Sequence, residues 1–133
     1  MLRNIAQKLK AFMLLAGQTV TADTNSASAN LKDLRNFAFL VVMGNFSFTG
    51  TNKIGLKMQE SDDNSIFTDC PLSAYAGGVL KECIAAADAN TTHVVEYKGV
   101  KQFVRLALDV SGTVSVAAAV AGISDDVQFK PAL

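Results

Sequence analysis

The chain has 133 residues, of which 50% are hydrophobic and 18% are charged, and its formal net charge at pH 7 is zero. This length fits one domain with a sizeable core. The charged share lies below the usual value of about 25%, which slightly favours a surface that is used for contacts. Nucleic acid is disfavoured as a partner, because phosphate binding requires clustered positive charge and the only basic cluster is Arg3, Lys8 and Lys10. A membrane-spanning helix is not predicted, since no apolar run approaches ~20 residues.

The first predicted element is an amphipathic helix over residues 2–16. Its apolar residues recur at spacings of three and four, and Gly17 is a suitable helix stop. A helix this short is marginal alone, so it needs a surface to pack on. It packs either on its own domain, as amphipathic helices usually do, or on a partner as a docking arm. The arm hypothesis assigns partner binding to Leu2, Ile5, Leu9, Phe12 and Met13.

After Gly17 the pattern changes to that of strands, with alternating or continuous apolar residues between polar turns. Two hairpins are expected, one around the 61–65 turn and one around Gly99. In the last strand, Val114, Val116, Ala118 and Val120 share one face. Strands are predicted at 18–22, 36–43, 54–59, 66–70, 79–84, 93–97, 103–110 and 113–123. Gly44 and Asn45 interrupt the second of these, and Phe46 and Phe48 then alternate with Ser47 and Thr49.

This spacing of short strands and turns predicts a mainly β chain. We expect an antiparallel β-sandwich, jelly-roll-like, with about seven or eight strands and one N-terminal α-helix. The predicted layout is an N-terminal helix or arm at 1–17, a sandwich at 18–123 and a C-terminal tail at 124–133.

Four carboxylates gather around the 61–65 turn, namely Glu60, Asp62, Asp63 and Asp69. Calcium takes oxygen ligands of this kind. The segment lacks the glycine and the terminal glutamate of an EF-hand loop, however, so ordinary solvated turn residues are the favoured interpretation. No metal site is predicted.

Cys70, Cys83 and His93 are too few and too irregularly spaced for a zinc site. Two reduced, partly buried thiols are favoured, and pairing of the two cysteines stays open. A catalytic triad would need His93 beside Cys83 or Asp88, and no phosphate-binding glycine signature is present. We therefore predict no catalytic residue and no cofactor, and we do not expect an enzyme.

Two stretches resemble small virion proteins of tailed phages, of the capsid decoration or cement type, which are often encoded beside the major capsid protein. The first is FTGTNKIGLKMQESDDNSIFTD over residues 48–69. The second is YKGVKQFVRL over residues 97–106, followed by DVSGTVS over residues 109–115. A related FVRL hairpin also occurs in discoidin-like, sugar-binding jelly rolls. The predicted N-terminal helix is not part of the phage pattern.

The resemblance implies a protein that is made in the host cytoplasm and ends on the exterior of the capsid. Its implied partner is the major capsid protein lattice, which it would bind as a symmetric homo-oligomer, with a trimer favoured. One alternative is a carbohydrate-binding head fibre or adhesin, although the chain has no Trp and only two Tyr for stacking on sugars. A neck or tail completion protein is the other alternative.

Overall fold

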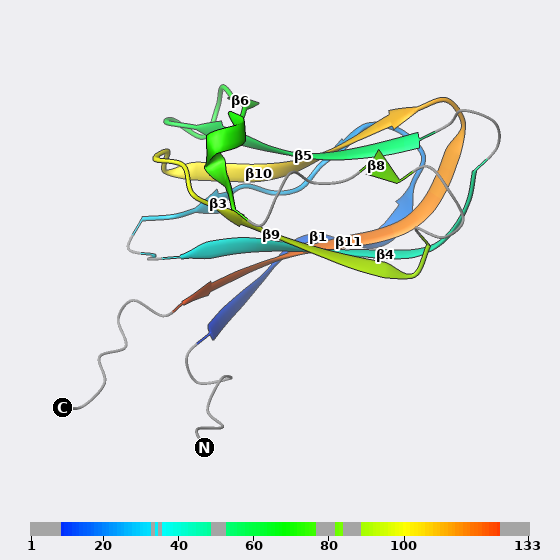
Figure 1. The fold of residues 1–133 in the computed structure, drawn as a ribbon, viewed down its shortest axis with the longest axis horizontal. Coiled ribbons are helices and arrows are strands. Elements are labelled where there is room, and N and C mark those ends of the chain that lie inside the picture. The colour runs from blue at the N-terminus through cyan, green and yellow to red at the C-terminus, as the bar shows by residue number, and fades with distance from the viewer. Residues whose placement is uncertain are drawn as a thin grey trace, which may run out of the picture.

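The structure is a computed structural model of the full chain, and it describes residues 9–32, 34, 36–48, 53–76, 82–83 and 89–125. In this part of the chain, eleven strands form two antiparallel sheets, which confirms the mainly β prediction. The sheets lie over one another in two layers (Figure 1). In chain order the elements are β1 (Leu9–Val20), β2 (Thr24–Asn25), β3 (Ala29–Asn30), β4 (Phe37–Phe48), β5 (Lys53–Ser61), β6 (Thr68–Asp69), the 3-10 turn η1 (Leu72–Ala74), β7 (Tyr75–Ala76), β8 (Glu82–Cys83), β9 (Thr91–Tyr97), β10 (Phe103–Ser111) and β11 (Val114–Asp125).

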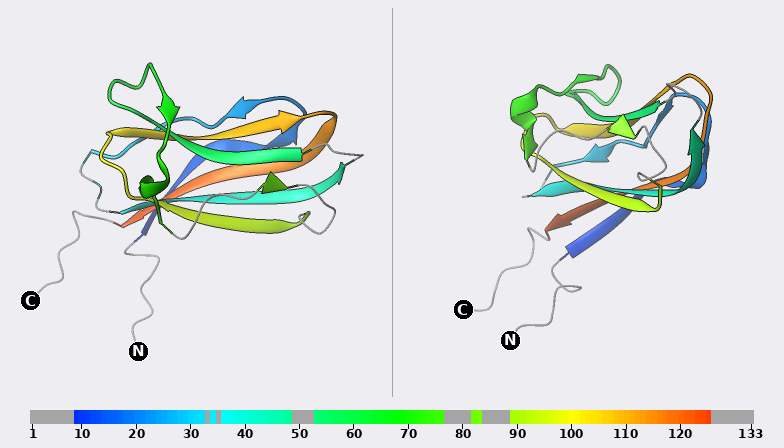
Figure 2. Two further views of the ribbon diagram at one scale, coloured as in Figure 1. Left: turned by 45° about the horizontal axis from the view of Figure 1, so that its top comes forward. Right: turned by 45° about the vertical axis from the view of Figure 1, so that its right-hand side comes forward.

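The first sheet has the strand order β1-β11-β4-β9-β7. The second sheet has the order β2-β10-β5-β6, with β3 also paired to β10 and β8 paired to β5. In the second sheet, β10 and β5 pair without interruption from Phe103–Ser61 to Ser111–Lys53. β4 and β5, β9 and β10, and β10 and β11 are each consecutive long strands that lie in different sheets, and the two layers can be compared in the two views of Figure 2.

The core lies between the two sheets and is built from alternate residues of the long strands. Phe39 and Val41 of β4 are fully buried, as are Leu106 and Leu108 of β10. Each such side chain contributes about 1.5–3 kcal/mol by leaving water. The predicted inward face of the last strand is confirmed, because Val114, Val116, Ala118 and Val120 are all buried.

The predicted hairpin around residues 61–65 is confirmed, since Gln59 pairs with Asp69 and Glu60 with Thr68. The predicted hairpin around Gly99 is wrong, because β9 and β10 belong to different sheets. The reason is the buried Tyr97, around which the connection folds. Its hydroxyl donates to Glu60 Oε1 at 2.7 Å and accepts from the amide of Lys101 at 3.1 Å. A Cβ at residue 99 would overlap the Tyr97 ring, so this close passage requires glycine.

The predicted helix is wrong over residues 9–16, which belong to the strand β1. Pairing with β11 supplies the backbone hydrogen bonds, and tertiary context of this kind overrides local propensity. The apolar residues of the predicted helix do not share one side of the strand, because Leu9 points outward and Phe12 inward. β1 also has two register shifts, one between Met13 and Leu15 and one between Leu15 and Gln18. These shifts break strict alternation, so Leu14 and Leu15 are both buried.

Gly17, which was predicted to stop a helix, lies inside β1 at the second register shift. β1 therefore runs across the predicted boundary at residue 17, and β11 continues to Asp125, beyond the predicted end of the sandwich at 123. Two residues of the predicted arm, Leu2 and Ile5, lie outside the described residues.

Candidate interaction surface

The outer face of the first sheet, which points away from the second sheet, carries a continuous apolar row. Directly paired residues of antiparallel strands point to the same side. The pairings Met13–Ala121, Ala121–Leu40 and Leu40–Val94 therefore align four apolar side chains across β1, β11, β4 and β9. Met13 is 71% exposed and Val94 is 60% exposed, so both ends of the row are open to solvent.

The rows on either side are mostly apolar and end at Glu96 and Thr92 of β9, and the apolar residues of the three rows form what we call the apolar face. It covers about 300–400 Å², from the strand and residue spacings of a sheet. The largest apolar patch on a typical monomer has this size and is often functional. The only charged residue in these three rows is Glu96, whose carboxylate pairs with the Lys98 ammonium at 3.1 Å. The apolar face consists of Ala11, Met13, Ala38, Leu40, Val42, Val94, Ala119, Ala121 and Ile123.

A groove of about 400 Å³ continues the apolar face toward the other end of β11. Two bulges create it. Gly44 and Asn45 of β4 together lie opposite the single residue Ala117, and Ala16 and Gly17 of β1 together lie beside Ala119. Apart from Gln18, the groove is lined by small or short side chains, among them Gly17, Thr19, Val42, Gly44, Ala117 and Ala119.

Glycine at position 44 keeps part of this groove open. A Cβ there would lie 3.1 Å from the Cβ of Ala117 and 3.3 Å from its carbonyl oxygen. Both distances are tighter than ordinary van der Waals contact, so a larger residue at 44 would push against β11. The groove therefore stays open only with small residues at position 44 of β4 and position 117 of β11.

The outer face of the second sheet is polar instead. Lys57 pairs with Asp109 at 3.1 Å and with Asp69 at 3.2 Å, and these carboxylates raise the pKa of Lys57, Asp109 most strongly. Gln59 donates to Asp69 at 2.9 Å, which lowers the pKa of that carboxyl, and it accepts from Arg105 Nε at 2.9 Å.

The Arg105 guanidinium also lies 4.1 Å from the centre of the Phe67 ring, close enough for a cation–π contact. The exposed groups of this sheet thus interact mainly with one another, and they leave no continuous apolar surface among its described residues.

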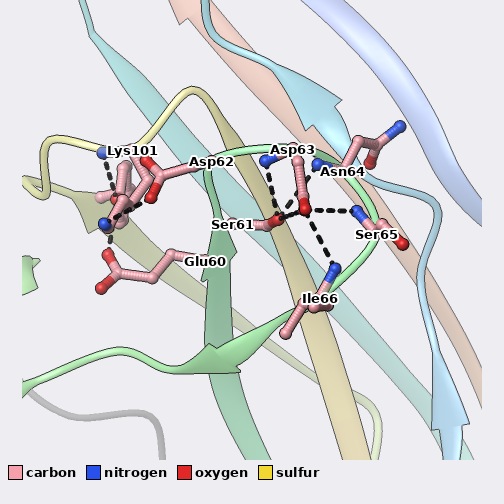
Figure 3. Close-up of polar contacts among 9 residues, drawn as sticks. Glu60, Ser61, Asp62, Asp63, Asn64, Ser65, Ile66 and Lys101 are labelled. Carbon is pink, nitrogen blue, oxygen red and sulfur yellow. Dashed lines mark hydrogen bonds and ion pairs between the residues drawn. The ribbon is translucent and has the colours of Figure 1, made fainter.

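The 61–65 turn is organised by its own side chains (Figure 3). The Asp63 carboxylate accepts from the amides of Ile66 and Ser65 at 3.0 and 2.9 Å, and these bonds lower the pKa of Asp63. Ser61 Oγ donates to Asp63 and accepts from the amide of Asn64 at 3.0 Å. Asn64 has a φ of 60°, a left-handed conformation that asparagine tolerates well.

The four carboxylates that suggested calcium are engaged separately. Glu60 accepts from Tyr97, Asp62 pairs with Lys101 at 2.8 Å, Asp63 binds turn amides and Asp69 binds Lys57. Among the described residues, no group of three or more His, Cys, Asp or Glu is arranged to hold a metal ion.

The candidate catalytic groups lie in different places. Cys83 lies in β8 of the second sheet and His93 in β9 of the first, while Asp88 lies outside the described residues. His93 Nε2 is 3.1 Å from the hydroxyl of Thr91. Cys70 is buried, and burial together with the nearby Glu60 raises its pKa to about 12. A thiol with such a pKa is a poor nucleophile near neutral pH.

The three described residues of the predicted arm divide between the two sides of β1. Met13 and Leu9 point to the outer side, whereas Phe12 is half-buried with its ring centre 6.4 Å from that of Phe37. Sequence reasoning found Met13 but missed Leu40, Val94 and the outward alanines of β11. Only the strand order brings these residues together.

Comparison with protein-family models gives no match, and no curated protein matches the chain. Within the described residues, no helix is both long enough and apolar enough to cross a membrane.

Proposed function

We propose that this chain is a structural protein of a tailed-phage particle that decorates the outside of the capsid. The observation that carries the proposal is the apolar face. Exposed apolar patches of this size, bordered by polar residues, mark interaction sites. The phage resemblance of residues 48–69 and 97–115 supplies the kind of partner, which is the major capsid protein lattice.

The strand order supports a β-sandwich of the jelly-roll type. The two sheets have the orders β1-β11-β4-β9 and β2-β10-β5-β6, and the chain changes sheets at almost every connection between long strands. This order matches that of an eight-stranded jelly roll when β2 and β3, which both pair with β10, are counted as one strand, and β7 and β8 are counted as additions. Jelly rolls occur in viral capsid proteins and in lectins, so the fold agrees with the proposal and with its sugar-binding alternative.

The mechanism is mechanical. Covering an apolar face of about 300–400 Å² gains about 8–10 kcal/mol at 25 cal/mol per Å². Association itself costs about 4–15 kcal/mol, so one copy binds weakly. Many linked copies on a repeating lattice add their contacts, which is how weak sites hold a shell together. The resemblance points to a symmetric oligomer, with a trimer favoured, as the linked unit.

A carbohydrate-binding head fibre or adhesin is the second candidate, favoured by the fold alone. Sugar stacking needs exposed aromatic faces, but Tyr97 is buried and the hydroxyl of Tyr75 accepts from the amide of Met58 at 2.8 Å. The Phe67 ring is already stacked by Arg105. A neck or tail completion protein differs from a decoration protein mainly in copy number.

Quantitative mass spectrometry of purified virions tests the proposal by counting this chain against the major capsid protein. A ratio near one to one is expected for a protein that covers the lattice. A ratio of a few per cent would move it to a vertex, neck or fibre. Absence from virions would contradict every particle role.

A further inference from the structure

We propose that the groove at Ala117 takes the segment of residues 127–133 from a second copy of this chain. The segment follows β11 and lies outside the described residues. The inference deepens the oligomeric part of the proposed function, and it holds or fails independently of capsid binding.

The sequence of the segment is VQFKPAL, in which apolar and polar residues alternate from Val127 to Lys130. Val127, Phe129, Pro131 and Leu133 fall on one side of an extended chain, and Gln128, Lys130 and Ala132 fall on the other. An extended segment with one apolar side matches a sheet face whose exposed residues are apolar. Lys130 would then point to water.

Pro131 argues for the groove and against a sheet edge. Proline cannot donate to a strand ladder, so a segment that contains it adds poorly as an extra strand to the free edge of β1. Part of that edge is also occupied, because the carbonyl of Leu14 accepts from the amide of Ala27 at 2.8 Å. Docking by side chains into a hollow has no such requirement. The groove, at about 400 Å³, lies within the usual range of about 300–1,000 Å³ for binding pockets.

The length of chain after β11 decides which copy can place Phe129 in the groove. Ala117 lies eight residues before Asp125 in β11, which is about 26 Å along the strand. Phe129 lies four residues after Asp125, so it reaches at most about 14 Å from that point. Phe129 therefore cannot enter the groove of its own chain, and a second copy must supply it; within one chain, only the last residues of the segment, such as Leu133, are far enough along to reach Ala117.

The contact is heterologous, since a segment at one end of a copy meets a groove at the other end of the next. Such contacts form closed rings when the rotation closes, and a trimer is one such ring. The groove and the segment thus provide a structural basis for the oligomer that the resemblance implies.

The test uses full-length protein without capsids, so its failure is distinct from failure of the capsid role. Phe129→Ser removes the main anchor of the segment, and Ala117→Gln fills the groove at an exposed position of β11. Gln128→Ser and Ser115→Gln are the matched controls, the first on the other side of the segment and the second on the same outer face but away from the groove. Masses are measured by light scattering after gel filtration.

We expect the wild type and both controls to have a multiple of the 14.1 kDa monomer mass, and both test variants to be monomers. When the two test variants are mixed, the intact segment of the Ala117→Gln chain can enter the intact groove of the Phe129→Ser chain. The remaining segment lacks Phe129 and the remaining groove is filled, so the complex cannot grow further. We therefore expect a one-to-one complex. A monomeric wild type, an oligomeric Phe129→Ser variant or a mixture without complexes would overturn the inference.

A fluorescence measurement gives a second readout, because the chain has no Trp. In F129W, the only indole emits at short wavelength when it is buried in a neighbour's groove. Adding Ala117→Gln to the same chain should shift the emission to longer wavelength. Unshifted emission in this double variant would place the segment elsewhere and contradict the inference.

Discussion

The two sheets are alike on the inside and opposite on the outside. Inward, both present fully buried side chains such as Phe39 in β4 and Leu106 in β10. Outward, the first sheet exposes Met13 and Val94, whereas the second bears the ion pairs of Lys57. A protein needs an apolar inner face to fold, but nothing in folding requires an apolar outer face. The difference between the outer faces therefore indicates where the molecule binds.

The largest expected effect comes from the inner faces, where the two sheets should respond alike. Phe39→Ala should lower the free energy of unfolding by about 3–5 kcal/mol and Leu106→Ala by about 2–5 kcal/mol, because each leaves a cavity in a shared core. Met13→Ala, at an exposed position, should change it by no more than about 0.5 kcal/mol. Urea titration measures all three, and a large loss for Met13→Ala would mean that the outer face is part of the core.

Burial should also control the reactivity of Cys70, which lies beside the second sheet. Its pKa of about 12 exceeds the ordinary 9.0, so the thiolate fraction near neutral pH is about 1,000-fold smaller than in the unfolded chain. In a Cys83→Ser background, iodoacetamide at pH 8 should label Cys70 quickly in denaturant and negligibly in the folded protein. Fast labelling of the folded protein would contradict the burial of this thiol.

Tyr97 joins the two layers, so its hydroxyl should matter to stability. Tyr97→Phe removes the donor to Glu60 and the acceptor for the Lys101 amide, and it should cost about 1–3 kcal/mol in the free energy of unfolding. Tyr75→Phe is a matched control that removes only the acceptor for the Met58 amide. Tyr97→Phe should be the more destabilising of the two in urea titrations, and the reverse order would remove the role given to the Tyr97 connection.

The smallest expected effect is on the polar face. The folded-state pKa of Asp69 lies below the ordinary 3.8, so its contribution to stability is present above that value and is lost as the pH falls through the folded pKa. Because the pair is largely exposed, the contribution is about 0–1 kcal/mol. Asp69→Asn should therefore lose slightly less stability than the wild type between pH 5 and 2. A larger loss for the variant would reverse the sign of this argument.

Local sequence patterns correctly predicted the strands that pair with each other without register shifts. β5 and β10 alternate strictly and were found from the sequence, as were the 61–65 turn and the inward side of β11. Strands with bulges were not found correctly. In β1 the shifts around Leu15 break the alternation that marks a strand, and in β4 the strand continues through Gly44 where the sequence suggested a break.

The apolar face itself could not be predicted from the sequence. Its central row joins Met13, Leu40, Val94 and Ala121, which are far apart in the chain and become neighbours only through the strand order. An exposed Val or Met has no local signature that separates it from a buried one. The polar face was easier to anticipate, because Lys53, Lys57 and Gln59 fall on one side of β5 and the apolar residues Ile54, Leu56 and Met58 fall on the other.

Binding of charge-substituted variants to tailed-phage heads, the partner that we propose, tests the central claim most directly. Val94→Lys places a charge on the apolar face, and Ser111→Lys places the same charge on an exposed position of the second sheet. Purified variants are mixed with heads that lack this protein, and the bound fraction is measured by sedimentation. We predict that Val94→Lys weakens binding at least tenfold, which corresponds to about 1.4 kcal/mol, while Ser111→Lys binds like the wild type. Equal binding by both variants, or loss only with Ser111→Lys, would contradict the assignment of the apolar face as the binding surface.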